Sequence, residues 1–180
     1  MPVPDPIGTS QVQDSLLSPS YAAALRFLSC RPRSEAEVRR RLSGRCPPDL
    51  VDRVMTTLRE QGFLDDAAFA RYWRENRERH RPKGQIMLRQ ELLRLGVPRD
   101  TVGVALEGFD AAGNAYRAGG KLARRLAQSN YLEYRHRMSA YLQRRGFSGT
   151  VVRETVERLW RELTDSLHGD ERCYEEQEQG

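Results

Sequence analysis

The sequence predicts an all-α fold of about nine helices, arranged as three successive triplets. A fragment recurs at an interval of 50 residues, because Leu42, Leu92 and Leu142 are spaced 50 apart, as are Gly96 and Gly146. A fixed interval of this length is typical of one small unit used repeatedly, and it favours a binding surface built by repetition over a single catalytic pocket. Apolar residues follow helical spacing, and no alternating run of β-branched residues predicts a strand.

The first triplet is delimited by proline and by a capping motif. Ser18-Pro19 predicts a helix start with the serine as cap, and Pro32 predicts the end of that helix. Ser34, with a glutamate three residues later, has the spacing of a capping box and predicts the start of the second helix. A Pro-Pro pair then breaks the chain, and the third helix is expected to end at Gly62.

The second triplet begins at Asp65-Asp66 and is interrupted at residues 82–84, and the third repeats its plan. We expect helices at 65–80, 85–95 and 99–107, then at 111–128, 130–145 and 148–167. The expected segments are a flexible arm rich in Pro, Ser and Gln at 1–18, three-helix repeats at 19–62, 63–108 and 109–167, and an acidic tail at 168–180.

The net charge of +5 is unevenly distributed along the chain. Residues 165–180 carry six acidic side chains and one arginine, so they hold −5 and the preceding residues hold +10. A basic body with an acidic end suits a protein that meets a polyanion or an acidic protein surface. The acidic end is expected either to remain solvated or to fold back on the basic body.

Basic side chains recur in all three repeats, and they are the candidate contacts to a partner or to nucleic acid. Ordinary solvated helix faces with i,i+4 ion pairs, such as Glu75 with Arg79, are the alternative interpretation. The candidates are Arg39, Arg40, Arg41, Arg71, Arg74, Arg77, Arg81, Lys83, Arg124, Arg125, Arg135, Arg137, Arg144 and Arg145.

Two groups of residues resemble sites without predicting one. Asp65 and Asp66 are interpreted as a helix cap and a partner of the helix dipole, rather than as a catalytic pair. The aromatic residues of the 65–80 helix are expected in the core, whereas the tyrosines of the 130–145 helix are left open between the core and exposed positions that stack on bases. They are Phe69, Tyr72 and Trp73, then Tyr131, Tyr134 and Tyr141.

No motif predicts an enzyme, a metal site or a cofactor. Gly119-Gly120-Lys121 lacks the leading glycine and the Ser/Thr of a phosphate-binding loop. The three cysteines and three histidines have no ligand spacing, and no nucleophile lies near a base in the sequence. The chain has no signal peptide and no apolar stretch long enough for a membrane span, so a cytoplasmic protein is expected.

The chain resembles the RecX family, the bacterial modulators of the RecA recombinase, over about Tyr21 to Leu163. The most specific segment is Gly62 to Ala70. The residues that carry the resemblance are Ala24-Leu25, Leu28, Arg31, Ser34, Glu37-Val38, Leu42, Leu58, Gly62-Phe63-Leu64-Asp65-Asp66, Phe69-Ala70, Gly84, Leu92 and Gly96-Val97. Two features depart from the pattern: Cys46 stands where later repeats have glycine, which predicts a different turn, and the acidic tail has no counterpart.

The resemblance implies an elongated, non-enzymatic protein of three tandem three-helix repeats. Such proteins lie along the groove of a RecA–single-stranded DNA filament and restrain ATP hydrolysis, filament growth and strand exchange in recombination and DNA repair. The expected partners are therefore the RecA nucleoprotein filament, single-stranded DNA and, more weakly, duplex DNA, with the chain itself a monomer. An autonomous DNA-binding protein or transcriptional regulator with helix-turn-helix-like repeats is the alternative.

Overall fold

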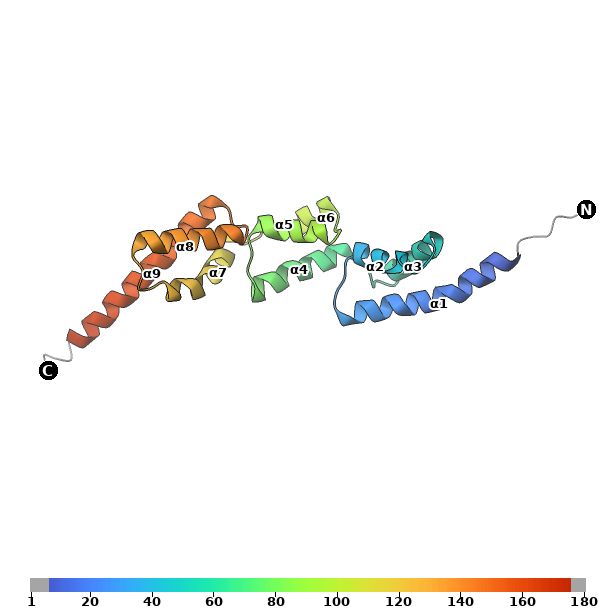
Figure 1. Ribbon diagram of the computed structural model, residues 1–180, viewed down its shortest axis with the longest axis horizontal. Coiled ribbons are helices and arrows are strands. Elements are labelled where there is room, and N and C mark those ends of the chain that lie inside the picture. Colours follow the sequence, from blue (N-terminus) through green and yellow to red (C-terminus); the bar gives the residue numbers. More distant parts are fainter. Residues whose placement is uncertain (1–6, 176–180) are drawn as a thin grey trace, which may run out of the picture. The chain divides into compact units, whose positions relative to one another are not determined.

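The computed structural model describes the backbone of residues 7–175 and the side chains of residues 19–166. Within that range it contains nine helices and no strand, as predicted (Figure 1). The helices are α1 (Ile7–Cys30), α2 (Glu35–Ser43), α3 (Pro48–Glu60), α4 (Asp66–His80), α5 (Gln85–Arg94), α6 (Arg99–Ala105), α7 (Ala111–Arg125), α8 (Tyr131–Arg144) and α9 (Gly149–Glu175).

The chain divides into two compact units. The first contains Met1–Tyr72 and Leu92–Ala105, and the second contains Trp73–Glu91 and Leu106–Gly180. The boundary therefore passes through α4 and α5, so the second triplet contributes residues to both units.

In the first unit, α1, α2 and α3 pack against one another (Figure 1). They enclose one hydrophobic core. Burial of each large apolar side chain contributes about 1.5–3 kcal/mol to folding. The buried members are Ala24, Val38, Leu42, Leu50, Val51, Val54, Met55, Leu58 and Leu64.

In the second unit, α7 and α8 pack against α9 (Figure 1). They enclose a second core that includes Tyr134, Met138 and Leu142. Gly119 lies inside α7, where a Cβ atom would come within 2.7 Å of Leu159 Cδ1. The Gly119-Gly120-Lys121 segment is thus part of a helix that packs closely on α9, and it forms no phosphate-binding loop.

Caps and turns delimit the helices where the sequence predicts them. Ser34 Oγ accepts from the Glu37 amide at 3.2 Å, and Glu37 Oε2 accepts from the Ser34 amide at 3.2 Å, which confirms the capping box. Helices α5 and α8 end two residues before Gly96 and Gly146, whose φ values of 86° and 82° favour glycine. The second helix of the first triplet has Gly44 at its C-cap with φ −76°, so its turn differs, as predicted.

Three helix ends differ from the prediction by three residues or more. Helix α7 ends at Arg125 rather than at residue 128, because the next residues form turns in which the Leu126 amide donates to the Ala123 carbonyl and the Ser129 amide to the Leu126 carbonyl. The expected start at Ser18 is wrong, because α1 begins at Ile7 and contains Pro19. A proline removes one backbone hydrogen bond and kinks a helix, but it does not prevent the preceding residues from being helical. Helix α9 continues past the expected end at residue 167, because no proline follows and a single interior glycine, Gly169, costs only about 1 kcal/mol.

Residues 1–6 and 176–180 lie outside the described part of the chain, as do the side chains of 7–18 and 167–175. The flexibility of the 1–18 arm and the placement of the acidic end therefore stay predictions.

Candidate polyanion-binding groove

A groove with a volume of about 640 Å³ lies in the second unit, between the segment 77–87 and the C-terminal end of α8. Its walls carry five cationic side chains, one tyrosine and one methionine. They are Arg77, Arg81, Lys83, Met87, Tyr141, Arg144 and Arg145, and we call this surface the basic groove.

Glu91 of α5 organises one wall of the basic groove. Its carboxylate accepts from Trp73 Nε1 and from Arg77 Nε, each at 2.9 Å, and it pairs with the ammonium group of Lys83. The Arg77 guanidinium also lies 4.6 Å from the centre of the Trp73 ring. Burial acts to raise the pKa of the Glu91 carboxyl, but the hydrogen bonds from Lys83, Trp73 and Arg77 outweigh burial and lower the pKa.

The opposite wall depends on a close approach between two backbone segments. The Gly84 amide donates to the Arg145 carbonyl at 2.8 Å, and a Cβ at Gly84 would lie 2.0 Å from the Gly146 carbonyl oxygen. Arg145 Nη1 donates to the Pro82 carbonyl at 3.2 Å, and its guanidinium stacks 4.6 Å from the centre of the Tyr141 ring. These contacts hold Arg145 at the groove.

Arg81 and Arg144 supply the exposed charge of the groove. Both side chains are exposed, and neither makes an ion pair with any side chain that the structure describes. Glu91 neutralises part of the charge of Arg77 and Lys83 on the first wall. The groove therefore keeps an excess of positive charge centred on Arg81, Arg144 and Arg145.

This arrangement suits phosphate or carboxylate groups spaced along a polymer. Guanidinium groups bind such oxygens through paired, charge-assisted hydrogen bonds. Binding of this kind follows the charge of the backbone and ignores base sequence, and it weakens as salt rises. Tyr141 is half-buried under Arg145, so it offers mainly a platform that orients the guanidinium.

The structure brings five of the fourteen predicted basic residues together in the basic groove. Three others lie in ion pairs: Arg39 with Asp52 at 2.6 Å, Arg74 with Glu78 at 2.9 Å, and Arg137 with Glu133 at 3.0 Å. The predicted alternative of i,i+4 pairs thus describes part of α4, where Arg79 also lies 3.9 Å from Glu75. The remaining six are exposed and make no ion pair among the described side chains: Arg40, Arg41, Arg71, Arg124, Arg125 and Arg135.

The adjacent aspartates have structural roles. Asp65 Oδ1 accepts from the amides of Ala67 and Ala68 at 2.8 and 2.9 Å, which confirms it as the cap of α4. Asp66 Oδ1 instead accepts from the Glu35 amide at 2.9 Å, so it satisfies a free donor in the first turn of α2. Burial raises the pKa of the Asp66 carboxyl.

The aromatic residues divide between core and surface. Phe69 is buried as predicted, whereas Tyr72 is 43% exposed. Among the three tyrosines left open, Tyr134 is fully buried, and burial raises the pKa of its hydroxyl to about 12. Tyr131 is 37% exposed, and Tyr141 lines the basic groove.

Met87, which lines the basic groove, and Glu91, which binds two of its cations, were not predicted, and Tyr141 was predicted only as one of three tyrosines left open between core and surface. A glutamate among arginines in a sequence usually indicates only exposed ion pairs. The sequence therefore did not predict that Glu91 would bind three donors. The one available signal was the repeat, since Glu91 and Tyr141 are 50 residues apart and occupy equivalent positions.

No helix in the described part of the chain is long and apolar enough to cross a membrane. Over the same residues, the histidine, cysteine and acidic side chains form no group of three that could hold a metal ion.

Three family models match the chain in sequence order. They describe the first, second and third three-helix domains of RecX, and they match residues 21–58, 65–106 and 112–156. Each range covers parts of all three helices of one triplet.

Curated relatives carry the name "Regulatory protein RecX". One from Mycobacterium ulcerans (strain Agy99) is 37% identical over 140 residues, covering 75% of this chain and 81% of that protein. One from Chlorobium limicola is 32% identical over 140 residues, covering 77% and 88%. The crystal structure of RecX from Lactobacillus salivarius superposes with a TM-score of 0.71 at 22% identity, covering 79% of this chain and 96% of that one, and supports the shared fold.

Proposed function

The chain belongs to the RecX family of regulatory proteins, and on that premise we propose that it regulates the RecA recombinase by inhibiting it on single-stranded DNA. In this proposal the protein binds along the groove of the RecA–DNA filament. It restrains ATP hydrolysis, filament growth and strand exchange during recombination and DNA repair.

The basic groove is the observation that carries the proposal. Arg81 and Arg144, which make no ion pair with the described side chains, and the oriented guanidinium of Arg145 match the oxygens of a DNA backbone or of acidic side chains on RecA protomers. A filament presents such groups at regular intervals, so a chain built from repeated units suits it better than it suits a single small ligand.

Inhibition follows from differential binding. A filament changes state as it hydrolyses ATP and grows, and a ligand shifts such an equilibrium only by the difference in its affinity for the two states. We propose that the protein contacts neighbouring protomers in one filament state and favours that state over the others. One bound molecule then slows several protomers.

Replacement of Arg81 and Arg144 by alanine tests the role of the groove. Both side chains are exposed and lack ion-pair partners among the described residues, so the double variant should fold normally. Affinity for RecA filaments, measured by fluorescence anisotropy of the labelled protein, should fall about tenfold or more, as expected when two charge-assisted contacts are lost.

The matched control removes the same charge elsewhere on the second unit. Lys121 and Arg161 are exposed and lie outside the groove, so Lys121→Ala/Arg161→Ala should retain near-normal filament affinity. Equal losses of filament affinity in the two double variants would mean that binding depends on the total charge of the protein and not on the basic groove. Tight, sequence-dependent binding of duplex DNA without RecA would instead favour the autonomous DNA-binding function.

A further inference from the structure

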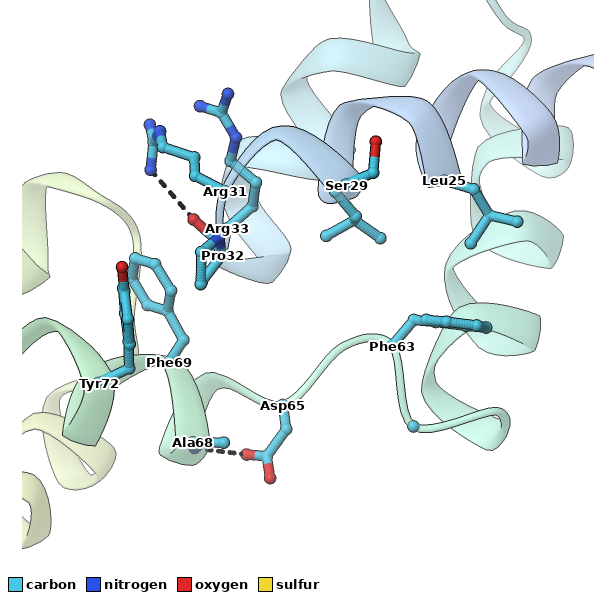
Figure 2. Close-up of a pocket in the computed structure, with 12 residues that line it drawn as sticks. Leu25, Ser29, Arg31, Pro32, Arg33, Phe63, Asp65, Ala68, Phe69 and Tyr72 are labelled. Atoms are coloured by element: carbon cyan, nitrogen blue, oxygen red, sulfur yellow. Dashed lines mark hydrogen bonds between the residues drawn. The ribbon is translucent and has the colours of Figure 1, made fainter.

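A second groove, of about 680 Å³, lies in the first unit and is mainly apolar. It runs between the end of α1, the loop before α4 and the first turns of α4 (Figure 2). Leu25 and Phe63 face each other across one part, and Phe69 and Tyr72 stand at the other (Figure 2). The apolar and aromatic lining residues are Leu25, Leu28, Pro32, Phe63, Phe69 and Tyr72, and we call this surface the apolar groove.

Phe63 departs from a motif that the chain uses three times. After Gly62, Gly96 and Gly146, the next amide donates to the carbonyl five residues earlier, which is the Schellman ending of a helix. The apolar residue at that position normally packs against the helix it terminates. Val97 and Phe147 do so and are 2% and 5% exposed, whereas Phe63 is 50% exposed and faces the apolar groove.

Two aromatic rings are thus left partly uncovered in one concave surface. Phe63 is 50% exposed and Tyr72 is 43% exposed, although the Phe63 amide is bonded to the Leu58 carbonyl and Tyr72 lies within α4. Exposed aromatic residues that line a concave surface mark a site of protein association, because such rings gain most when a partner covers them.

The rim of the apolar groove adds a charge preference. Arg31 and Arg33 stand at one edge (Figure 2). Their guanidinium groups share a single carboxylate oxygen of Glu37, at 2.7 and 3.3 Å. Asp65, at the opposite edge, is committed to the first-turn amides of α4. Two cations therefore share one carboxylate, and the edge favours a partner that supplies a second one.

We propose that the apolar groove is a protein-docking site for a segment of the RecA protomer that presents a bulky apolar side chain beside a carboxylate. The apolar side chain enters between Phe63 and Tyr72, and the carboxylate binds Arg31 or Arg33. This inference rests on the proposed function. It assigns a different contact to each unit: the first unit binds protein through the apolar groove, and the second unit binds phosphate through the basic groove.

The test compares binding to RecA filaments with binding to bare single-stranded DNA. Phe63→Ala/Tyr72→Ala should weaken filament binding about tenfold or more, the range expected for aromatic anchors of an interface. Its affinity for single-stranded DNA should stay within about twofold of the parent protein, because the basic groove is untouched. Leu132→Ala, at a 73% exposed position on α8, is the control and should change neither affinity.

Each outcome decides a different point. Unchanged filament binding by the double variant, with the parent protein binding normally, overturns the docking site and leaves the proposed function standing. No filament binding by the parent protein overturns both. A dimer of the parent protein that Phe63→Ala dissociates, seen by sedimentation velocity, would identify a second copy as the occupant and also overturn the inference. If helical circular dichroism shows that the double variant is unfolded, Tyr72→Ala alone decides the question.

Discussion

The amide of Gly84 donates to the carbonyl of Arg145 at 2.8 Å. An equivalent hydrogen bond occurs 50 residues earlier, where the hydroxyl of Ser34 donates to the carbonyl of Leu95. Gly84 and Ser34 each precede the second helix of a triplet, and Arg145 and Leu95 each follow the second helix of the next. The 50-residue interval is therefore the spacing of a repeated tertiary contact as well as of a repeated fold. In the second unit, this contact also builds one wall of the basic groove.

Gly84→Ala should destabilise the second unit. The new Cβ would lie 2.0 Å from the Gly146 carbonyl oxygen, and backbone on both sides must move to accept it. We expect a loss of about 1–3 kcal/mol or more in the free energy of unfolding, measured by thermal and urea denaturation. Gly120→Ala is the control: its Cβ meets open space inside α7, so the change should be neutral or stabilising by up to about 1 kcal/mol. Equal stability of the two variants would refute the close approach.

Ser34→Ala should cost more stability than Asn130→Ala. Both residues cap a helix through a side-chain oxygen, and loss of a cap alone costs about 1 kcal/mol. Ser34 is fully buried and its hydroxyl also donates to Leu95, whereas Asn130 is exposed. We expect an additional loss of about 1 kcal/mol for Ser34→Ala in urea denaturation. Equal losses would mean that the contact with Leu95 contributes nothing.

Glu91→Gln should remove a pH dependence of stability. The folded state lowers the pKa of Glu91, so its contribution is complete above the ordinary carboxyl pKa and is lost as pH falls through the lowered value. At neutral pH the variant should be less stable by about 1–3 kcal/mol, since Arg77 and Lys83 lose their charged partner. The difference should shrink below about pH 4. Glu154→Gln, an exposed position on α9, is the control for charge. A constant difference from pH 7 to pH 3 would contradict this account.

Arg81→Ala/Arg144→Ala should change the salt dependence of binding to single-stranded DNA. Each phosphate contact contributes about 0.7 to the slope of log affinity against log salt, so loss of two contacts should reduce its magnitude by about 1.4. Titrations between low and moderate salt measure the slope. The Lys121→Ala/Arg161→Ala control should leave it close to that of the parent protein. An unchanged slope in the groove variant would show that these arginines do not contact phosphate.

The structure also argues against a simpler test. Replacement of Arg71, Arg74 and Arg77 on α4 would remove the bonds of Arg74 to Glu78 and to the Glu107 carbonyl. It would also remove the bond of Arg77 to Glu91. A loss of binding in that variant would mix structural and functional effects.

The helices could be predicted because their signals are local. Ser34 and Asp65 are capping residues at the right spacing. Gly96 and Gly146 adopt the positive φ that commonly follows the last turn of a helix. The start of α1 was missed because a proline is compatible with the first turn of a helix and, at a cost, with its interior.

From the sequence, only the clusters of arginines could be predicted, and their assembly into the basic groove could not. Which cations are free depends on partners far away in sequence, such as Glu91 for Arg77 and the Pro82 carbonyl for Arg145. The exposure of Phe63 could not be predicted either, because it depends on tertiary packing. Val97 and Phe147 follow the same local motif and are buried.

Regulation of RecA is tested most directly by the rate of DNA-dependent ATP hydrolysis by RecA on single-stranded DNA, titrated with this protein well below one molecule per protomer. We expect a substoichiometric fall in rate, because in the proposed mechanism one bound molecule favours one state of several protomers. Absence of any effect until the protein saturates the DNA would contradict it, and would leave simple competition for the strand.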